Sequence, residues 1–177
     1  MKRVLAISIN LLLCMVFDFS LNGQREIGHP PFMSPHFSPI VVSQGKVFVA
    51  NTPSDTIDVL DSKSGRVLRR IPVGLDPVSL AIRPDGLELW VSNHISDSVS
   101  VIDLDDSKPT FMHVIATIQD IDPESKATRF DEPMGIAFAD ERKAYVALSS
   151  ENKIAVVDVA TRKVIKFLTI PAQDPRA

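Results

Sequence analysis

Apolar and polar residues alternate along three stretches of the chain that resemble one another. The middle stretch runs from Leu87 to Leu104, and its counterparts run from Val47 to Asp61 and from Ala144 to Asp158. In each, two alternating runs flank a short polar segment. Alternation with a period of two is typical of β-strands. Each stretch therefore predicts two strands joined by a turn.

The three stretches align position by position. Their aromatic residues Phe48, Trp90 and Tyr145 coincide, and each is followed by a valine. The spacing is 42 positions from Phe48 to Trp90 and 55 positions from Trp90 to Tyr145, which fits a period of roughly 40 residues with one insertion. Periods of this length are typical of propellers, solenoids and arrays.

Further strands are predicted before and after each pair. Apolar runs precede the pairs at Ile40 to Val42, Val78 to Ile82 and Met134 to Phe138, and β-rich runs follow them at Arg66 to Val73, Phe111 to Ile118 and Lys163 to Ile170. Pro77 and Pro133 open two of the preceding runs, where the missing N–H group costs least. Four strands per repeat is the number in a propeller blade.

Apolar residues occupy both faces of each predicted sheet. The valines are expected on one face, and the opposite face is expected to hold Phe48, Trp90 and Tyr145 together with Leu60, Ile102 and Val157. A two-layer sandwich usually leaves one face of each antiparallel sheet in solvent, whereas radial stacking covers both faces. The predicted fold is therefore all-β, an incomplete β-propeller of about three four-stranded antiparallel blades.

Three tetrapeptides carry a resemblance to a known family. FVAN at Phe48 to Asn51, WVSN at Trp90 to Asn93 and YVAL at Tyr145 to Leu148 resemble the motif that names the YVTN family of β-propeller repeats. The resemblance covers about Ser38 to Ala177. It departs from the family pattern at Leu148, which replaces Asn, and in the link from Ile118 to Pro133, which spans 15 positions where Ile71 to Pro77 spans 6. The resemblance implies the fold but not the function, since the family includes surface-layer, adhesion-like and redox-associated proteins.

The first 23 residues have the pattern of a secretory signal peptide. Met1 to Arg3 is basic, and Val4 to Phe17 is an apolar run of about 14 residues, shorter than the about 20 that a membrane span needs. We therefore expect residues 1–23 to be a signal peptide and residues 24–37 a Pro-rich lead-in. The predicted location is secreted, periplasmic or at the cell surface, with no transmembrane segment.

Residues 38–177 are expected to form the partial propeller. The predicted blades are at about 38–76, 77–132 and 133–174, and a fourth repeat is predicted to start at 175–177, because Ile170 to Ala177 matches Ile71 to Ser79. Propellers usually need about four to eight blades to close. We therefore expect an N-terminal fragment of a larger protein, or a truncated reading frame, whose partners include the remaining propeller blades.

Composition argues against several function classes. The single cysteine, Cys14, lies in the predicted leader, so the mature chain has no C-x-x-C-H site for covalent haem. Loss of Lys2, Arg3 and Asp18 with the leader changes 19 basic and 22 acidic residues to 17 and 21, a balance that gives no indication of nucleic-acid binding. Glycine-rich phosphate loops, G-x-S-x-G and H-E-x-x-H are absent from the sequence. No catalytic residue and no cofactor are predicted.

Two weak metal-ligand patterns do not change this picture. His29 and His36 stand in the lead-in without a third ligand at a supporting spacing. The aspartates of the insertion resemble the start of a calcium loop, but Ser125 and Asp131 stand where an EF-hand needs Gly and Glu. Metal binding is therefore not expected.

Polar residues in the turns and connections are candidates for a ligand-binding face. In a propeller, the turn between the second and third strands and the connection to the next blade open on the same face, which commonly carries ligands. The candidate residues are Asn51, Asp76, Asn93, His94 and Asp131. Asn and Asp also bond to their own backbone in tight turns, so a structural role is the alternative for these positions.

Two functions are compatible with these observations. The first is a noncatalytic extracytoplasmic module that recognises a protein, glycan or surface component through its loop face. The alternative, which the family resemblance implies, is the propeller part of a larger enzyme, either redox and linked to a c-type cytochrome or lactonase-like, with catalytic residues beyond Ala177. Binding is favoured, because a fold alone does not confer chemistry.

Overall fold

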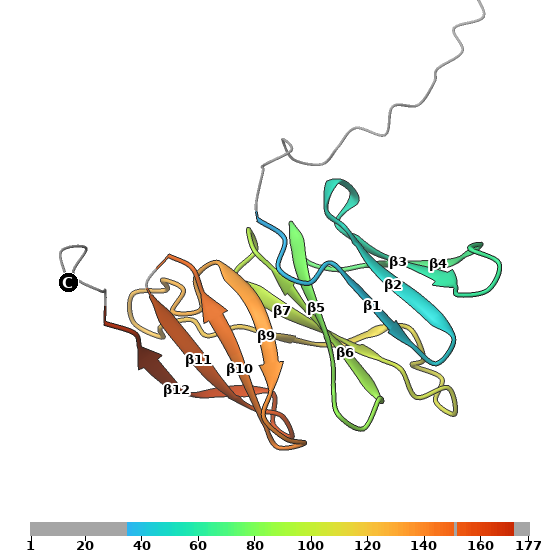
Figure 1. The fold of residues 1–177 in the computed structure, drawn as a ribbon. Coiled ribbons are helices and arrows are strands. Elements are labelled where there is room, and N and C mark those ends of the chain that lie inside the picture. Colours follow the sequence, from blue (N-terminus) through green and yellow to red (C-terminus); the bar gives the residue numbers. More distant parts are fainter. Residues whose placement is uncertain (1–34, 151, 172–177) are drawn as a thin grey trace, which may run out of the picture.

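Three small sheets make up the computed structural model, which describes residues 35–150 and 152–171. The predicted signal peptide, most of the lead-in and the start of the fourth repeat lie outside these residues. Twelve strands form three four-stranded antiparallel sheets, and a 3-10 turn, η1 (Thr52–Ser54), joins two of the strands (Figure 1). The predicted all-β fold of about three propeller blades is confirmed. None of the described residues forms a helix long and apolar enough to cross a bilayer.

Each blade is a meander in which consecutive strands pair. Blade 1 contains β1 (Ile40–Ser43), β2 (Lys46–Asn51), β3 (Thr56–Asp61) and β4 (Val67–Pro72). Blade 2 contains β5 (Pro77–Ile82), β6 (Glu88–Asn93), β7 (Ser98–Asp103) and β8 (Val114–Ile118). Blade 3 contains β9 (Pro133–Phe138), β10 (Lys143–Leu148), β11 (Lys153–Asp158) and β12 (Lys163–Thr169). The first strands β1, β5 and β9 lie next to one another, so the blades are arranged around them (Figure 1).

Local chemistry explains where several strands begin. Pro77 and Pro133 are the first residues of β5 and β9, as the sequence predicts. The predicted start of a strand at Phe111 is wrong, because β8 begins only at Val114. The residues before it form turns, in which the Phe111 N–H donates to Lys108 O at 3.1 Å and Met112 has a positive φ of 58°.

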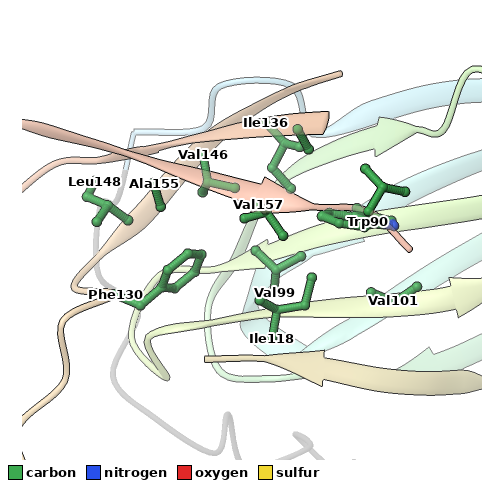
Figure 2. Close-up of a cluster of buried hydrophobic side chains, with 12 residues drawn as sticks. Trp90, Val99, Val101, Ile118, Phe130, Ile136, Val146, Leu148, Ala155 and Val157 are labelled. Atoms are coloured by element: carbon green, nitrogen blue, oxygen red, sulfur yellow. The ribbon is translucent and has the colours of Figure 1, made fainter. Parts of the chain in front are cut away.

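Burial separates the middle blade from the two outer ones. Every residue of β6 and β7 is buried, whereas β3 and β11 are only partly buried. One apolar core lies between blades 1 and 2, which we call seam 1/2, and contains Phe48, Ile57, Val59, Leu89, Val91 and Ile102 among others. The second lies between blades 2 and 3, seam 2/3, and contains Trp90, Val99, Val101, Phe130, Val146 and Val157 among others (Figure 2). Blade 2 is therefore covered on both faces, as radial stacking requires.

The side chains divide between the two faces differently from the prediction. Trp90 lies in seam 2/3 together with Val101, while Ile102 lies in seam 1/2 together with Leu89. Directly opposed residues on neighbouring strands share a face, and Trp90 opposes Val101 whereas Leu89 opposes Ile102. The expectation that Trp90 and Ile102 share a face opposite the valines is therefore wrong.

A buried carboxylate ties blades 2 and 3 together. Glu88 is 5% exposed and accepts hydrogen bonds from Trp90 Nε1 at 2.9 Å and from Arg83 Nη1 at 2.8 Å. Arg162 of blade 3 donates from Nη2 to the same carboxylate at 2.7 Å. Hydrogen bonds between charged groups are stronger than neutral ones, so Glu88 fixes one end of seam 2/3.

Candidate functional site

An aspartate with a left-handed backbone holds each of two connections between blades. Asp55 (φ 52°) follows β2, and its Oδ1 accepts the backbone N–H of Asp76 at 2.9 Å. Asp97 (φ 47°) follows β6, and its Oδ1 accepts the N–H of Glu132 at 2.9 Å. Asn152 (φ 49°) occupies the equivalent turn of blade 3. Asp and Asn enter this conformation more readily than most residues with a side chain, so the turn and the connection position each other.

One polar pair from each blade lies at the end of the molecule where β1, β5 and β9 begin. We call this end the loop face and the three pairs the polar rim. Each pair joins the residue after the second strand of a blade to a residue just before its first strand. The pairs are His36 with Thr52, Asp76 with His94, and Glu132 with Ser149.

Two of these pairs are joined by side chains. Ser149 Oγ donates to Glu132 Oε2 at 2.9 Å. Thr52 Oγ1 donates to the carbonyl oxygen of Pro77 at 2.8 Å and lies 2.7 Å from His36 Nε2. Because the only hydroxyl proton of Thr52 is used, His36 Nε2 must be the donor in the second contact. The rim therefore has defined hydrogen-bond directions in blades 1 and 3.

The third pair keeps unused hydrogen-bonding capacity. The His94 N–H donates to the Asp76 carbonyl oxygen at 2.9 Å, so the two residues are in contact through the backbone. The Asp76 side chain is fully buried at 0% exposure. Within residues 35–150 and 152–171, no group bonds either Asp76 carboxylate oxygen, and none bonds the buried Nδ1 of His94. Buried polar atoms nearly always have partners, so this pair is the most distinctive feature of the rim.

The two predicted asparagines do not lie on the rim itself. Asn93 ends β6, is fully buried, and donates from Nδ2 to Ser98 Oγ at 3.0 Å and Ser100 Oγ at 2.9 Å. Asn51 ends β2 and donates from Nδ2 to Asp58 Oδ2 at 3.2 Å. Both side chains are therefore bonded within their own sheets.

Asp131, the remaining candidate, belongs to an acidic patch at the loop face. Burial raises the pKa of the Asp97 carboxyl, and the neighbouring carboxylates of Asp131 and Glu132 raise it further, while the N–H of Glu132 acts in the opposite direction. The structure thus brings Asp131 next to Asp97 and next to one member of the rim. Asp97 was not among the residues that the sequence singled out.

The insertion before blade 3 is an ordered hairpin with a buried base. Ile121 and Thr128 form an antiparallel bridge, and Arg129 Nη2 donates to Asp120 Oδ1 at 2.7 Å. Phe130 is fully buried in seam 2/3, in the same core as Leu148 (Figure 2). The insertion and the replacement of Asn by Leu, which are separate departures in the sequence, therefore form one packing unit.

The described residues contain no cluster of three or more His, Cys, Asp or Glu side chains suited to a metal ion. The polar rim offers charge and hydrogen-bond acceptors: the Glu132 carboxylate accepts from Ser149, and the His94 ring nitrogen Nδ1 has no partner among the described residues. These properties suit recognition of a polar ligand.

Comparison with known proteins supports the fold and leaves the function open. No protein-family model matches the chain, and no curated protein matches it. The structure of hydrazine synthase from Kuenenia stuttgartiensis is similar with a TM-score of 0.63 and 27% sequence identity over 84% of this chain. U3-55K (TM-score 0.57, 21% identity, 77% of this chain) and virginiamycin B lyase from Staphylococcus aureus (0.57, 18% identity, 76%) share the fold. This chain spans 41% of the length of each of these three.

Proposed function

We propose that the chain is a noncatalytic, extracytoplasmic propeller module that binds a protein, glycan or surface component through the polar rim. The observation that carries this proposal is the Asp76–His94 pair, whose buried acceptor atoms have no partner among the described residues. Equivalent positions in blades 1 and 3 also hold polar pairs, so all three blades contribute to one face. The signal-peptide pattern and the resemblance to YVTN repeats support a role outside the cytoplasm.

The chemistry of the rim indicates which ligand groups it would recognise. Glu132 offers exposed carboxylate oxygens. The buried Asp76 carboxylate adds negative charge beside His94, whose ring nitrogen accepts a hydrogen bond when its proton is on the other nitrogen. A ligand that presents several N–H or O–H groups, or a cationic group, would complement these acceptors. Charge-assisted hydrogen bonds of this kind contribute roughly 1.5–3 kcal/mol each.

A binding screen with a matched variant tests the proposal. The unmodified chain and an Asp76→Asn/His94→Ala variant are compared on a glycan array and against extracted cell-surface proteins. We expect bound ligands to lose at least about tenfold in affinity in the variant, which corresponds to one charge-assisted hydrogen bond. Asp106→Asn, an exposed aspartate in the turn after β7, serves as the control and should leave binding unchanged. Equal binding by the unmodified chain and the rim variant would refute a role for the rim.

The likeness to hydrazine synthase favours one second candidate, the propeller part of a larger redox enzyme. That likeness extends over 84% of this chain at 27% identity. The test is to express the uninterrupted reading frame from the source DNA and record its absorption spectrum. A haem Soret band, with C-x-x-C-H in the same frame, would support the redox candidate. A product that consists only of repeats and shows no such band would exclude it.

A further inference from the structure

A groove crosses the outer part of seam 1/2, between β4 of blade 1 and the strands β7 and β8 of blade 2. Two adjoining cavities of about 260 Å³ and about 250 Å³ form it, and Pro72 and Val114 line both. The hydroxyl groups of the first cavity belong to Ser98, Ser100 and Thr117, and the basic groups of the second belong to Arg69, Arg70 and His113. Arg70 is ion-paired with Asp58. Together the two cavities reach the size of small-molecule sites.

The hydroxyl groups of the first cavity are held from below by Asn93. Both N–H groups of its side-chain amide are used, one donated to Ser98 Oγ and one to Ser100 Oγ. Both serines are buried, at 2% and 3% exposure, so their positions are fixed. Ser100 Oγ accepts from Asn93, and it donates to no described residue, so its own proton can be donated into the groove.

Arg69 in the second cavity retains an unpaired positive charge. Arg69 Nη2 lies 2.6 Å from His113 Nε2, and since a guanidinium can only donate, Nε2 accepts and the imidazole is neutral in this arrangement. Arg69 forms no ion pair with any described residue. No aspartate or glutamate lines either cavity. The other N–H groups of Arg69 can therefore bind an anion, and a carboxylate matches their planar geometry.

Seam 2/3 shows that the groove is not a general result of stacking blades. Counting back from Pro77 and Pro133, Phe130 stands where Gly74 stands, and Leu148 replaces Asn93. The buried Phe130 ring fills the equivalent space of seam 2/3 (Figure 2). In seam 1/2 a side chain cannot enter in this way, because even a Cβ atom on Gly74 would lie 2.7 Å from Asn93 Cγ.

We propose that this groove binds a sugar acid. Arg69 binds the carboxylate, the apolar surfaces of Pro72 and Val114 contact the C–H face of the sugar ring, and Ser100 and Thr117 bond its hydroxyl groups. An acidic peptide would need free backbone groups along the groove to pair with, whereas the first cavity presents side-chain hydroxyls and Pro72 has no N–H. The groove is separate from the polar rim, and the proposal does not depend on the function of the rim.

The test uses a galacturonic acid disaccharide as the probe and the uncharged galactose disaccharide as its match. Binding to the full chain is measured by calorimetry. We expect the acidic sugar to bind and the neutral one to bind at least about tenfold more weakly, the loss of one charge-assisted hydrogen bond. Arg69→Ala should lower the affinity for the acidic sugar by a similar factor. Arg66→Ala, which removes an exposed arginine outside the groove, should not.

A second variant tests the location. Gly74→Phe/Asn93→Leu copies the Phe130–Leu148 pair into seam 1/2 and should abolish binding. If this variant does not fold, the comparison of Arg69→Ala with Arg66→Ala still tests whether the acidic sugar binds in the groove. Equal binding of the two sugars, no binding of either, stronger binding of an acidic peptide of similar length, or full binding by Arg69→Ala would each overturn the proposal. The rim variant Asp76→Asn/His94→Ala should keep its affinity for the acidic sugar, which separates this site from the proposed function.

Discussion

At the scale of single residues, the left-handed aspartates decide how the connections meet the turns. Asp55 and Asp97 each accept one N–H group from the connection to the next blade. A sequence shows that Asp is common in turns, but it does not show which N–H group the side chain will reach. For the same reason the composition of the loops could indicate a polar face, whereas the bonding of Asn93 within its own sheet depends on the register of β6 with β7.

The raised pKa of Asp97 makes a prediction about pH. A carboxyl whose pKa is raised by folding contributes stability below its unfolded pKa of about 3.9, and this contribution is lost as the pH rises through the folded pKa. Asp97→Asn keeps the oxygen that accepts the Glu132 N–H but cannot ionise. We expect it to raise the free energy of unfolding by about 0.5 kcal/mol at pH 7 and to have no such advantage near pH 3.

Urea unfolding at both pH values measures this difference. The control is the same substitution in an Asp131→Asn background, where part of the repulsion is already absent and the gain at pH 7 should shrink. A gain of equal size at pH 3 and pH 7 would show that ionisation of Asp97 is not its cause.

At the scale of elements, the sequence predicted the strands well because period-2 alternation is a local signal. The sequence predicted neither that the insertion forms a hairpin nor that its Phe130 packs in the same core as Leu148 of blade 3. Phe130 and Leu148 are 18 positions apart, and their relation is seen only when each is compared with its counterpart in the preceding repeat, Gly74 or Asn93. The two replacements can be seen in the sequence, but only the structure shows that the replacing residues belong to one core in seam 2/3.

The insertion should therefore contribute to stability through one residue. Phe130→Ala removes a fully buried ring and is expected to lower the free energy of unfolding by about 3–5 kcal/mol. Ile121→Ala, on the same hairpin but 50% exposed, should change it by no more than about 0.5 kcal/mol. Fluorescence of Trp90, the single tryptophan and a member of the same core, reports the transition. Similar losses in both variants would show that the hairpin acts as a whole.

At the scale of the whole molecule, the outer faces of blades 1 and 3 differ from the faces inside the seams. Ile40, Val42 and Val67 are at least half exposed on blade 1, and Ile165 is 58% exposed on blade 3. The equivalent faces of blade 2 are covered by its neighbours. Uncovered apolar faces of this kind promote association. The end repeats of a repeat protein normally carry polar outer faces, whereas blades 1 and 3 expose apolar residues on theirs.

We expect the purified chain to self-associate in sedimentation velocity experiments, increasingly with concentration. Val42→Lys places a charge on the outer face of blade 1 and should shift association to about tenfold higher concentration, equivalent to about 1.4 kcal/mol. Ile95→Lys changes an exposed apolar residue in a turn and should have no effect. A monomer at all concentrations, or an equal effect of both substitutions, would contradict this explanation.

The two seams also differ in a way that matters while the chain folds. Blades copied from one repeat can stack in the wrong order or exchange between molecules, a known failure of repeat proteins. If blade 3 took the place of blade 2, Leu148 would lie next to Gly74, and the space that the Phe130 ring fills would be empty. In the opposite exchange Asn93 would lie next to Phe130, and its amide would be buried without hydrogen-bond partners. We therefore expect the polar packing of seam 1/2 and the aromatic packing of seam 2/3 to disfavour stacking of either blade in the other's place.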